Sequence, residues 1–246
     1  MESILAKELK LKLQPVAVIF TNEKPEDAVQ FKEGCWGCVV AMMNAAGKGK
    51  IAAFDREHFG CGGGAIGLGL RDTYDHVPGG IEYFLSTGKG EGFPPGEAYK
   101  KNPELAKIFA DQLPMIDIPY DYVVFKPLDK VDHNKETPQL VIMLANPDQL
   151  AALVVLANYD RPGNDNVIAP FSAGCHTIVL IPYSESQKEQ QKAVIGILDI
   201  SARPYVDPDI MSFTVPFKMF LQMEANVPGS FLEKNDWKKI RDRIPN

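Results

Sequence analysis

Residues 138–160, PQLVIMLANPDQLAALVVLANYD, contain the pattern that decides the fold class. The apolar run at 140–144 has the length of one buried strand. Asn146 follows almost at once, and asparagine is a preferred residue at the position that caps the start of a helix. The apolar residues that continue to position 157 then predict a helix. A strand that passes directly into a helix favours a fold that mixes both elements.

The flanking sequence extends this reading in both directions. Apolar runs predict strands at 15–20, 51–55, 121–128 and 193–200. Helical patterns occupy 4–13 and 38–50, and Asn102 with Pro103 predicts a third helix start. The apolar segment 175–183 is expected to form a further strand, and 211–223 is also apolar. Because strands and helices do not alternate strictly, we expect an α+β fold with a mixed sheet and packed helices.

The length and composition bound the class of protein. The chain has 246 residues, of which 45% are hydrophobic and 24% charged, so we expect a single domain spanning 1–246. A net charge of −6 argues against binding to a nucleic-acid backbone. Neither a signal peptide nor an apolar run of membrane-spanning length is present in the sequence. We therefore expect a cytoplasmic protein without a membrane partner, whose cysteines stay reduced.

A weak internal repeat relates residues 15–70 to residues 138–205. Both stretches contain a strand, a Gly-Cys pair, an apolar segment, a polar insert and an apolar strand that ends in Asp. An ancient duplication would place Cys35 and Cys175 at equivalent points of two similar, intertwined half-domains. A chance repetition of the common strand–helix rhythm explains the same pattern.

The four cysteines carry the clearest chemical signal. Cys35 and Cys38 form a C-x-x-C, and Cys61 and Cys175 stand alone. Thiolates are soft ligands, and four of them can hold an iron–sulfur cluster or a structural zinc ion. Zinc usually takes two C-x-x-C pairs, whereas scattered single cysteines are normal for clusters built into larger proteins. Two further readings stay open: redox chemistry at Cys35 and Cys38 alone, with Cys35 at a helix N-terminus, and inert buried thiols.

The glycines beside Cys61 raise a second question. Gly62, Gly63 and Gly64 follow it directly, and such a run is costly to order unless the backbone adopts unusual angles or approaches another group closely. Backbone N–H groups there would contact a cluster or cradle a small anion. Asn158, in a long polar loop, and Arg203, after a predicted strand, are further candidates for binding an anionic ligand.

Several segments together resemble a known prokaryotic family. They are LQPVAVIF (13–20), FGCGGG (59–64), FKPLD (125–129), DISARPYVDPDIMSFTVPFKMF (199–220) and GSFLEKNDWKKIRDRI (229–244). The chain is similar over nearly its whole length to the family catalogued as domain of unknown function 169. This resemblance implies one cytoplasmic α+β unit, widespread in anaerobic bacteria and archaea, with no agreed activity or catalytic residues. The anaerobic association favours the iron–sulfur reading.

Two functional hypotheses follow. In the first, Cys35, Cys38, Cys61 and Cys175 hold an iron–sulfur cluster in a protein with a redox or small-anion-handling role. Its partners would be a redox protein or a small anionic ligand. In the second, the protein binds or senses a small ligand without catalysis, and its cysteines are buried or bind zinc.

Overall fold

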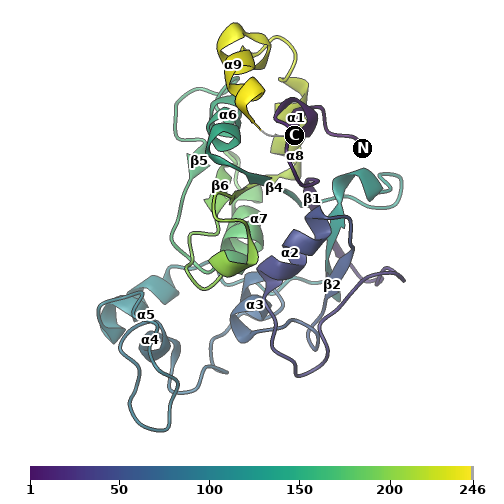
Figure 1. Cartoon of the computed structure of the whole chain (residues 1–246). Coiled ribbons are helices and arrows are strands. Elements are labelled where there is room, and N and C mark those ends of the chain that lie inside the picture. The colour runs from purple at the N-terminus through teal and green to yellow at the C-terminus, as the bar shows by residue number, and fades with distance from the viewer. Residues whose placement is uncertain (245–246) are drawn as a thin grey trace.

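The central feature of the molecule is one mixed β-sheet. The computed structural model in Figure 1 describes residues 1–244. The strands are β1 (Val16–Thr21), β2 (Ala52–Phe54), β3 (Tyr122–Pro127), β4 (Leu140–Ala145), β5 (Val167–Ile168), β6 (Ala193–Gly196) and β7 (Met211–Pro216). In the described residues they lie in the order β2-β3-β1-β4-β7-β6-β5, antiparallel except for the β5–β6 pair. The predicted α+β class with a mixed sheet is confirmed.

Helices cover both faces of this sheet. They are α1 (Ile4–Glu8), α2 (Val39–Gly47), α3 (Gly62–Gly67), α4 (Ile81–Phe84), α5 (Pro103–Asp111), α6 (Pro147–Ala157), α7 (Ile181–Ser186), α8 (Phe217–Ala225) and α9 (Asn235–Arg243). Short 3₁₀ turns are η1 (Leu128–Lys130), η3 (Arg203–Tyr205) and η4 (Phe231–Glu233), and η2 (His176–Leu180) is a π-helical turn. None of the helices within 1–244 combines the length and apolar character that crossing a membrane requires.

Alternation along the strands divides the core into two layers. Ile19 and Val141 pack with residues of α1, α6, α8 and α9 on one face. Val18 and Ile142 point to the other face and pack with α2 and η2, together with Cys175. Successive strand side chains point to opposite faces, so each strand contributes to both layers. The second layer is the one that carries the cysteines.

The junction of β4 and α6 forms as the sequence predicts. Asn146 caps α6: its Oδ1 accepts a hydrogen bond from Gln149 N at 3.0 Å, and Gln149 Oε1 accepts one from Asn146 N at 2.8 Å. This reciprocal pair satisfies two backbone donors that the first helical turn leaves free. The Gln149 amide also donates to the carbonyls of Leu9 and Lys10, which ties α6 to the chain after α1. These hydrogen bonds satisfy the side-chain amide of Gln149, which explains why this polar residue can be buried.

Other expected elements form with corrected boundaries. The helix expected over 4–13 ends at Glu8, because Lys10 adopts a left-handed φ of 51°. The helix expected over 38–50 spans Val39–Gly47, and α5 begins at Pro103 after an Asn102 cap. The strand expected over 175–183 is wrong, because this segment forms η2 and the start of α7. All five residues of η2 are buried, and a fully buried helix shows the same continuous apolar run as a strand.

The sheet order bears on the internal repeat. The antiparallel β1–β4 pair joins two halves of the sheet. Read inward toward this pair, one half contains the order β2-β3-β1 and the other contains the order β6-β7-β4. The helical segments α2 and η2 both belong to the layer on the cysteine side. This arrangement is the one that two related half-domains would adopt, and the duplication itself stays a prediction.

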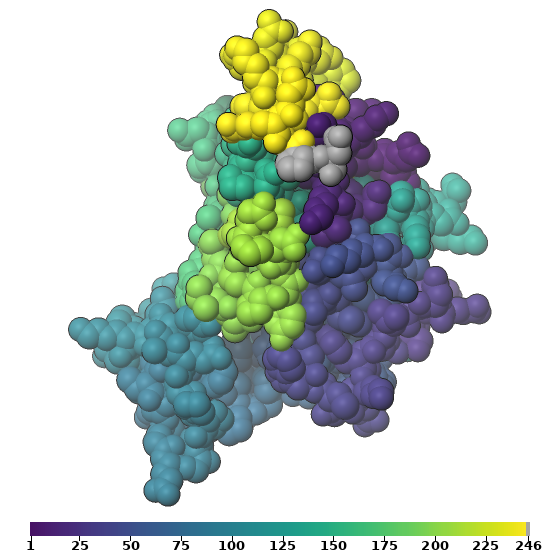
Figure 2. All heavy atoms as spheres, viewed as in Figure 1, coloured from purple at the N-terminus to yellow at the C-terminus, as the bar shows by residue number. Residues whose placement is uncertain are grey.

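The segment between β2 and β3 leaves the sheet. It carries α3 against the sheet layer and then extends outward into a lobe that contains α4 and α5 (Figure 1). The space-filling view shows this lobe standing apart from the main body, with a hollow between them (Figure 2). The lobe thereby supplies one wall of the site described next.

Candidate functional site

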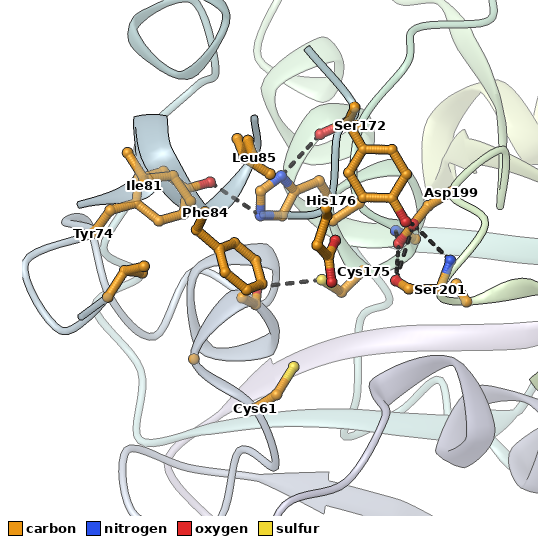
Figure 3. A pocket seen from close by; sticks show the side chains of 18 of the residues that line it. Cys61, Tyr74, Ile81, Phe84, Leu85, Ser172, Cys175, His176, Asp199 and Ser201 are labelled. Atoms are coloured by element: carbon orange, nitrogen blue, oxygen red, sulfur yellow. Dashed lines mark hydrogen bonds between the residues drawn. The ribbon is translucent and has the colours of Figure 1, made fainter. Parts of the chain in front are cut away.

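A cavity of about 400 Å³ lies between the lobe and the cysteine-side layer. Its walls come from the start of α2, the first turn of α3, the lobe, the segment that enters η2, and residues 199–205 after β6. Cys38, Cys61 and Cys175 all line it, although they come from widely separated parts of the chain. Figure 3 shows the cavity with two of these thiols and the polar residues opposite them.

Cys61 stands at the start of α3. Its Sγ accepts a hydrogen bond from Gly64 N at 3.2 Å and so caps the helix. Burial raises the pKa of this thiol, and the hydrogen bonds from the first-turn backbone oppose that rise only in part. The thiol is therefore protonated near neutral pH.

The glycines after Cys61 form this helix and not a turn with unusual angles. Close packing against neighbouring atoms explains Gly62 and Gly64, and it also explains Gly67, three residues after Gly64. A Cβ on Gly62 would lie 2.0 Å from His76 Nε2, one on Gly64 would lie 2.9 Å from Val39 Cγ2, and one on Gly67 would lie 2.5 Å from Cys175 Sγ. Gly63 lines the cavity, and a Cβ there would meet no atom within 4 Å. The alternative of close approach is thus the correct one for Gly62 and Gly64.

Cys175 also packs against α3. It directly precedes η2, and its Sγ donates a hydrogen bond to the Gly63 carbonyl at 3.2 Å. Burial raises its pKa well above the ordinary value, and the charges of Cys61 and Cys38 raise it further. The Cys175 thiol is therefore protonated near neutral pH.

The two cysteines of the C-x-x-C have different environments. Cys38 is partly buried at the N-terminal cap of α2, and burial raises its pKa. Cys35 is exposed in the preceding loop and does not line the cavity. The expectation that Cys35 stands at a helix N-terminus is wrong, because α2 begins only at Val39. Cys38 and Cys175 each directly precede a helical segment of the same layer.

The ligand atoms are not gathered around one point. Within residues 1–244, no group of three or more His, Cys, Asp or Glu side chains is tight enough to hold a single metal ion. Thiolates that hold a cluster bind different iron atoms, so their sulfurs stand further apart than four ligands of one ion. The absence of such a group among residues 1–244 therefore bears on a single-ion site more than on a cluster site.

A buried histidine lies deeper in the cavity wall. His176 Nδ1 is 2.9 Å from Ser172 Oγ, and its Nε2 is 3.5 Å from the Tyr74 hydroxyl (Figure 3). Burial lowers the pKa of His176 to about 4, so the imidazole is neutral at pH 7. Burial also raises the pKa of Tyr74. This side of the cavity therefore presents neutral polar groups.

Asp199 supplies the buried charge of the site. Only 6% of the residue is exposed. Its carboxylate accepts hydrogen bonds from the Tyr99 hydroxyl, from Gly174 N, and from the backbone and hydroxyl of Ser201 (Figure 3). All of these donors are neutral. The Asp199 charge contributes to the raised pKa values of Cys38, Cys61 and Cys175, which shows that its field extends across the cavity.

The other two predicted ligand-binding residues lie elsewhere and do not line the cavity. Asn158 ends α6, where its amide donates to the Val154 carbonyl and its Oδ1 accepts from Asn166. The Arg203 guanidinium donates to the carbonyls of Ile210 and Pro208. The structure therefore joins Gly62, Gly63 and three cysteines at one site, and it gives Asn158 and Arg203 local structural partners.

Several residues of the cavity are not among the ligand-binding residues predicted from the sequence. Tyr74 and His76 come from the lobe, and His176 and Asp199 come from the far half of the chain. The sequence offered one signal for His176, its position directly after Cys175. The sequence offered no signal for Asp199, whose carboxylate is held by neutral donors.

Comparison of the chain with known proteins identifies its family but does not identify an activity. The family model DUF169, described as uncharacterised ArCR, matches residues 4–226. The chain belongs to this family. No curated protein and no solved structure matches the chain. The match extends over all seven strands and every residue of the cavity, so sheet and site both belong to the part shared with the DUF169 family.

Proposed function

We propose that this protein binds an iron–sulfur cluster in the cavity and has a redox role. The observation that carries the proposal is the presence of Cys38, Cys61 and Cys175 in the lining of one cavity. Cysteine is a preferred core residue, so single buried thiols are unremarkable, but three from distant segments at one opening are not expected from packing alone.

The charges around the thiols support a cationic occupant. Each of the three has a raised pKa, because burial and neighbouring negative charge disfavour the thiolate. A bound iron core would reverse this balance, since it deprotonates its ligands and neutralises their charge. The protons released would leave through the open side of the cavity. Iron binding is therefore expected to be stronger at higher pH.

The backbone around the thiols supplies further support. Gly64 N already donates to Cys61 Sγ, and hydrogen bonds to ligating sulfur tune the potential of a cluster. Gly63 has open space above its Cα on the cavity side. A side chain there would occupy the volume that a cluster needs.

Cys35 is the weakest of the four candidate ligands. It is exposed and lies outside the cavity wall. We therefore propose that Cys38, Cys61 and Cys175 would hold the cluster. Cys35 would serve as a ligand only after its loop moved.

The test is anaerobic reconstitution with iron and sulfide, followed by metal and sulfide analysis and visible and EPR spectroscopy. Cys61→Ser is the test variant, and Cys35→Ser is the matched control because both replace one sulfur by oxygen. We expect wild type and Cys35→Ser to bind a cluster and Cys61→Ser to lose it while keeping its circular dichroism. A wild-type protein that binds no iron after reconstitution would refute the proposal. Equal loss in both variants would restore Cys35 as a ligand.

A second candidate function is binding of a small organic ligand without a cluster. A volume of about 400 Å³ lies in the range of small-molecule sites, and apolar side chains form much of the wall. Zinc, expected as an alternative occupant, would be found by the same metal analysis. Absence of both metals would leave ligand binding as the function of the cavity.

A further inference from the structure

A second feature of the cavity is its aromatic lining. Tyr74, Phe84, Tyr99, Phe109 and Phe171 all line it, and they come from the lobe and from the segment before η2. Tyr99 and Phe171 have ring centroids 5.6 Å apart, and Phe109 and Phe171 are 5.5 Å apart. Aromatic faces carry partial negative charge, so a wall of several rings attracts cations.

The formal charges along this wall have the same sign. Asp199 and Glu97 line the cavity, and no Lys or Arg is among the described residues that do so. Burial and the Asp199 charge both raise the pKa of Glu97. The two carboxyl groups therefore interact electrostatically. A buried carboxylate without a positive partner is costly, and a cation that enters the cavity would reduce that cost.

These rings already attract one cation of the protein. Lys100 Nζ lies 4.7 Å from the centroid of Phe109 and 5.6 Å from that of Phe171. Lys100 itself does not line the cavity. Because Lys100 already contacts Phe109 and Phe171, the attraction for a cation inside the cavity comes mainly from Tyr74, Phe84 and Tyr99.

We propose that the aromatic part of the cavity binds a small organic cation of the alkylated ammonium class. Aromatic rings and carboxylates together are the features that recognise such cations, which bury methyl groups as well as charge. A small anion, expected from the glycine run and Arg203, would face two carboxyl groups and no basic side chain. The inference rests on the aromatic wall and not on the cluster, so it stands if the cysteines prove to be free.

The test compares three probes of one shape by titration calorimetry on the full-length protein. They are choline, its neutral isostere 3,3-dimethylbutan-1-ol and the anion 3,3-dimethylbutanoate. We expect choline to bind about tenfold or more tightly than the neutral isostere, and the anion not to bind. Equal binding of choline and the isostere would overturn the charge argument. Tighter binding of the anion, or no binding of choline up to about 10 mM, would overturn the proposal.

A pair of variants locates the site. Glu97→Gln removes a charge at the cavity mouth, and Glu91→Gln removes one from an exposed residue of the same segment that does not line the cavity. We expect the first to weaken choline binding several-fold and the second to leave it unchanged. Equal effects would mean that the cation senses only the net charge and would refute this site. The titrations are repeated on cluster-free and reconstituted protein, so that failure of cluster binding and failure of cation binding are separate results.

Discussion

Two substitutions in α3 test the packing of the site because the structure predicts opposite signs for them. A Cβ on Gly67 would lie 2.5 Å from Cys175 Sγ and 2.9 Å from its backbone carbonyl carbon. The sulfur can rotate away, but the backbone cannot, so Gly67→Ala must shift η2 or α3. A Cβ on Gly63 would meet no atom within 4 Å. Gly63→Ala therefore introduces no contact that must be relieved.

The magnitudes follow from these distances. Overpacking a buried contact costs about 1–3 kcal/mol, and alanine regains up to about 1 kcal/mol of helix propensity. We expect Gly67→Ala to lower the free energy of unfolding by about 1–2 kcal/mol. Gly63→Ala should raise it by about 0.5 kcal/mol through the reduced entropy of the unfolded chain. For a chain of this size the Tm shifts are a fall of about 2–8 °C and a rise of about 1–2 °C.

The assay is urea denaturation followed by circular dichroism, with thermal melts on the same samples. Equal effects of the two alanines, or a stabilising effect of Gly67→Ala, would refute the packing of Cys175 against α3. Reconstitution adds a second comparison. Gly63→Ala is expected to lower iron loading although it does not destabilise the protein, because its methyl group enters the cavity. Full loading in Gly63→Ala would place the cluster away from this wall.

Three further outcomes are expected. His176 has a folded pKa of about 4 against an unfolded value near 6.5, so the unfolded chain binds more protons between these values. The free energy of unfolding should therefore fall by at most about 3 kcal/mol as the pH drops from 7 to 4, and urea titrations of His176→Gln should show a smaller fall. In metal-free protein at pH 7, iodoacetamide should modify the exposed Cys35 before the three cavity thiols, as peptide mass spectrometry would show. Asn146→Ala removes the cap of α6 and should cost about 1–2 kcal/mol by chemical denaturation, without changing iron loading.

Much of the fold could be predicted because local signals and tertiary structure agree. The cap at Asn146, the cap at Asn102 and the short apolar runs at β1 and β4 each specify their element through nearby residues. Segment 175–183 shows the limit of such reasoning. It is buried on all sides, so its apolar run contains no periodicity to separate a strand from a helix.

The site could be predicted only in part. The sequence shows the type of each residue, but it does not show which distant residues the fold brings together. The cysteines and the glycine run were visible as chemistry-bearing residues, and the repeat suggested that two cysteines are related. The sequence paired Cys35 with Cys175 because each follows a glycine. In the structure it is Cys38, and not Cys35, that directly precedes a helical segment as Cys175 does, and the equivalence of any two cysteines stays a prediction. Asn158 and Arg203 stay predictions as ligand-binding residues, and in the structure their side chains bond to nearby groups, as polar side chains near loops most often do.

Some irregular features of the molecule lie at or near the cavity. Ile197, a buried β-branched residue two positions before Asp199, has a φ of 60°, a conformation that is costly for its side chain. Its N–H donates to Thr177 Oγ1 in η2, and π-helical turns are themselves rare and common at functional sites. Both ring nitrogens of His76 are buried without a hydrogen-bond partner in the described residues. Packing alone would favour removing the strained φ of Ile197 and the unsatisfied nitrogens of His76, whereas a binding site can keep such costs because they position groups for a bound partner.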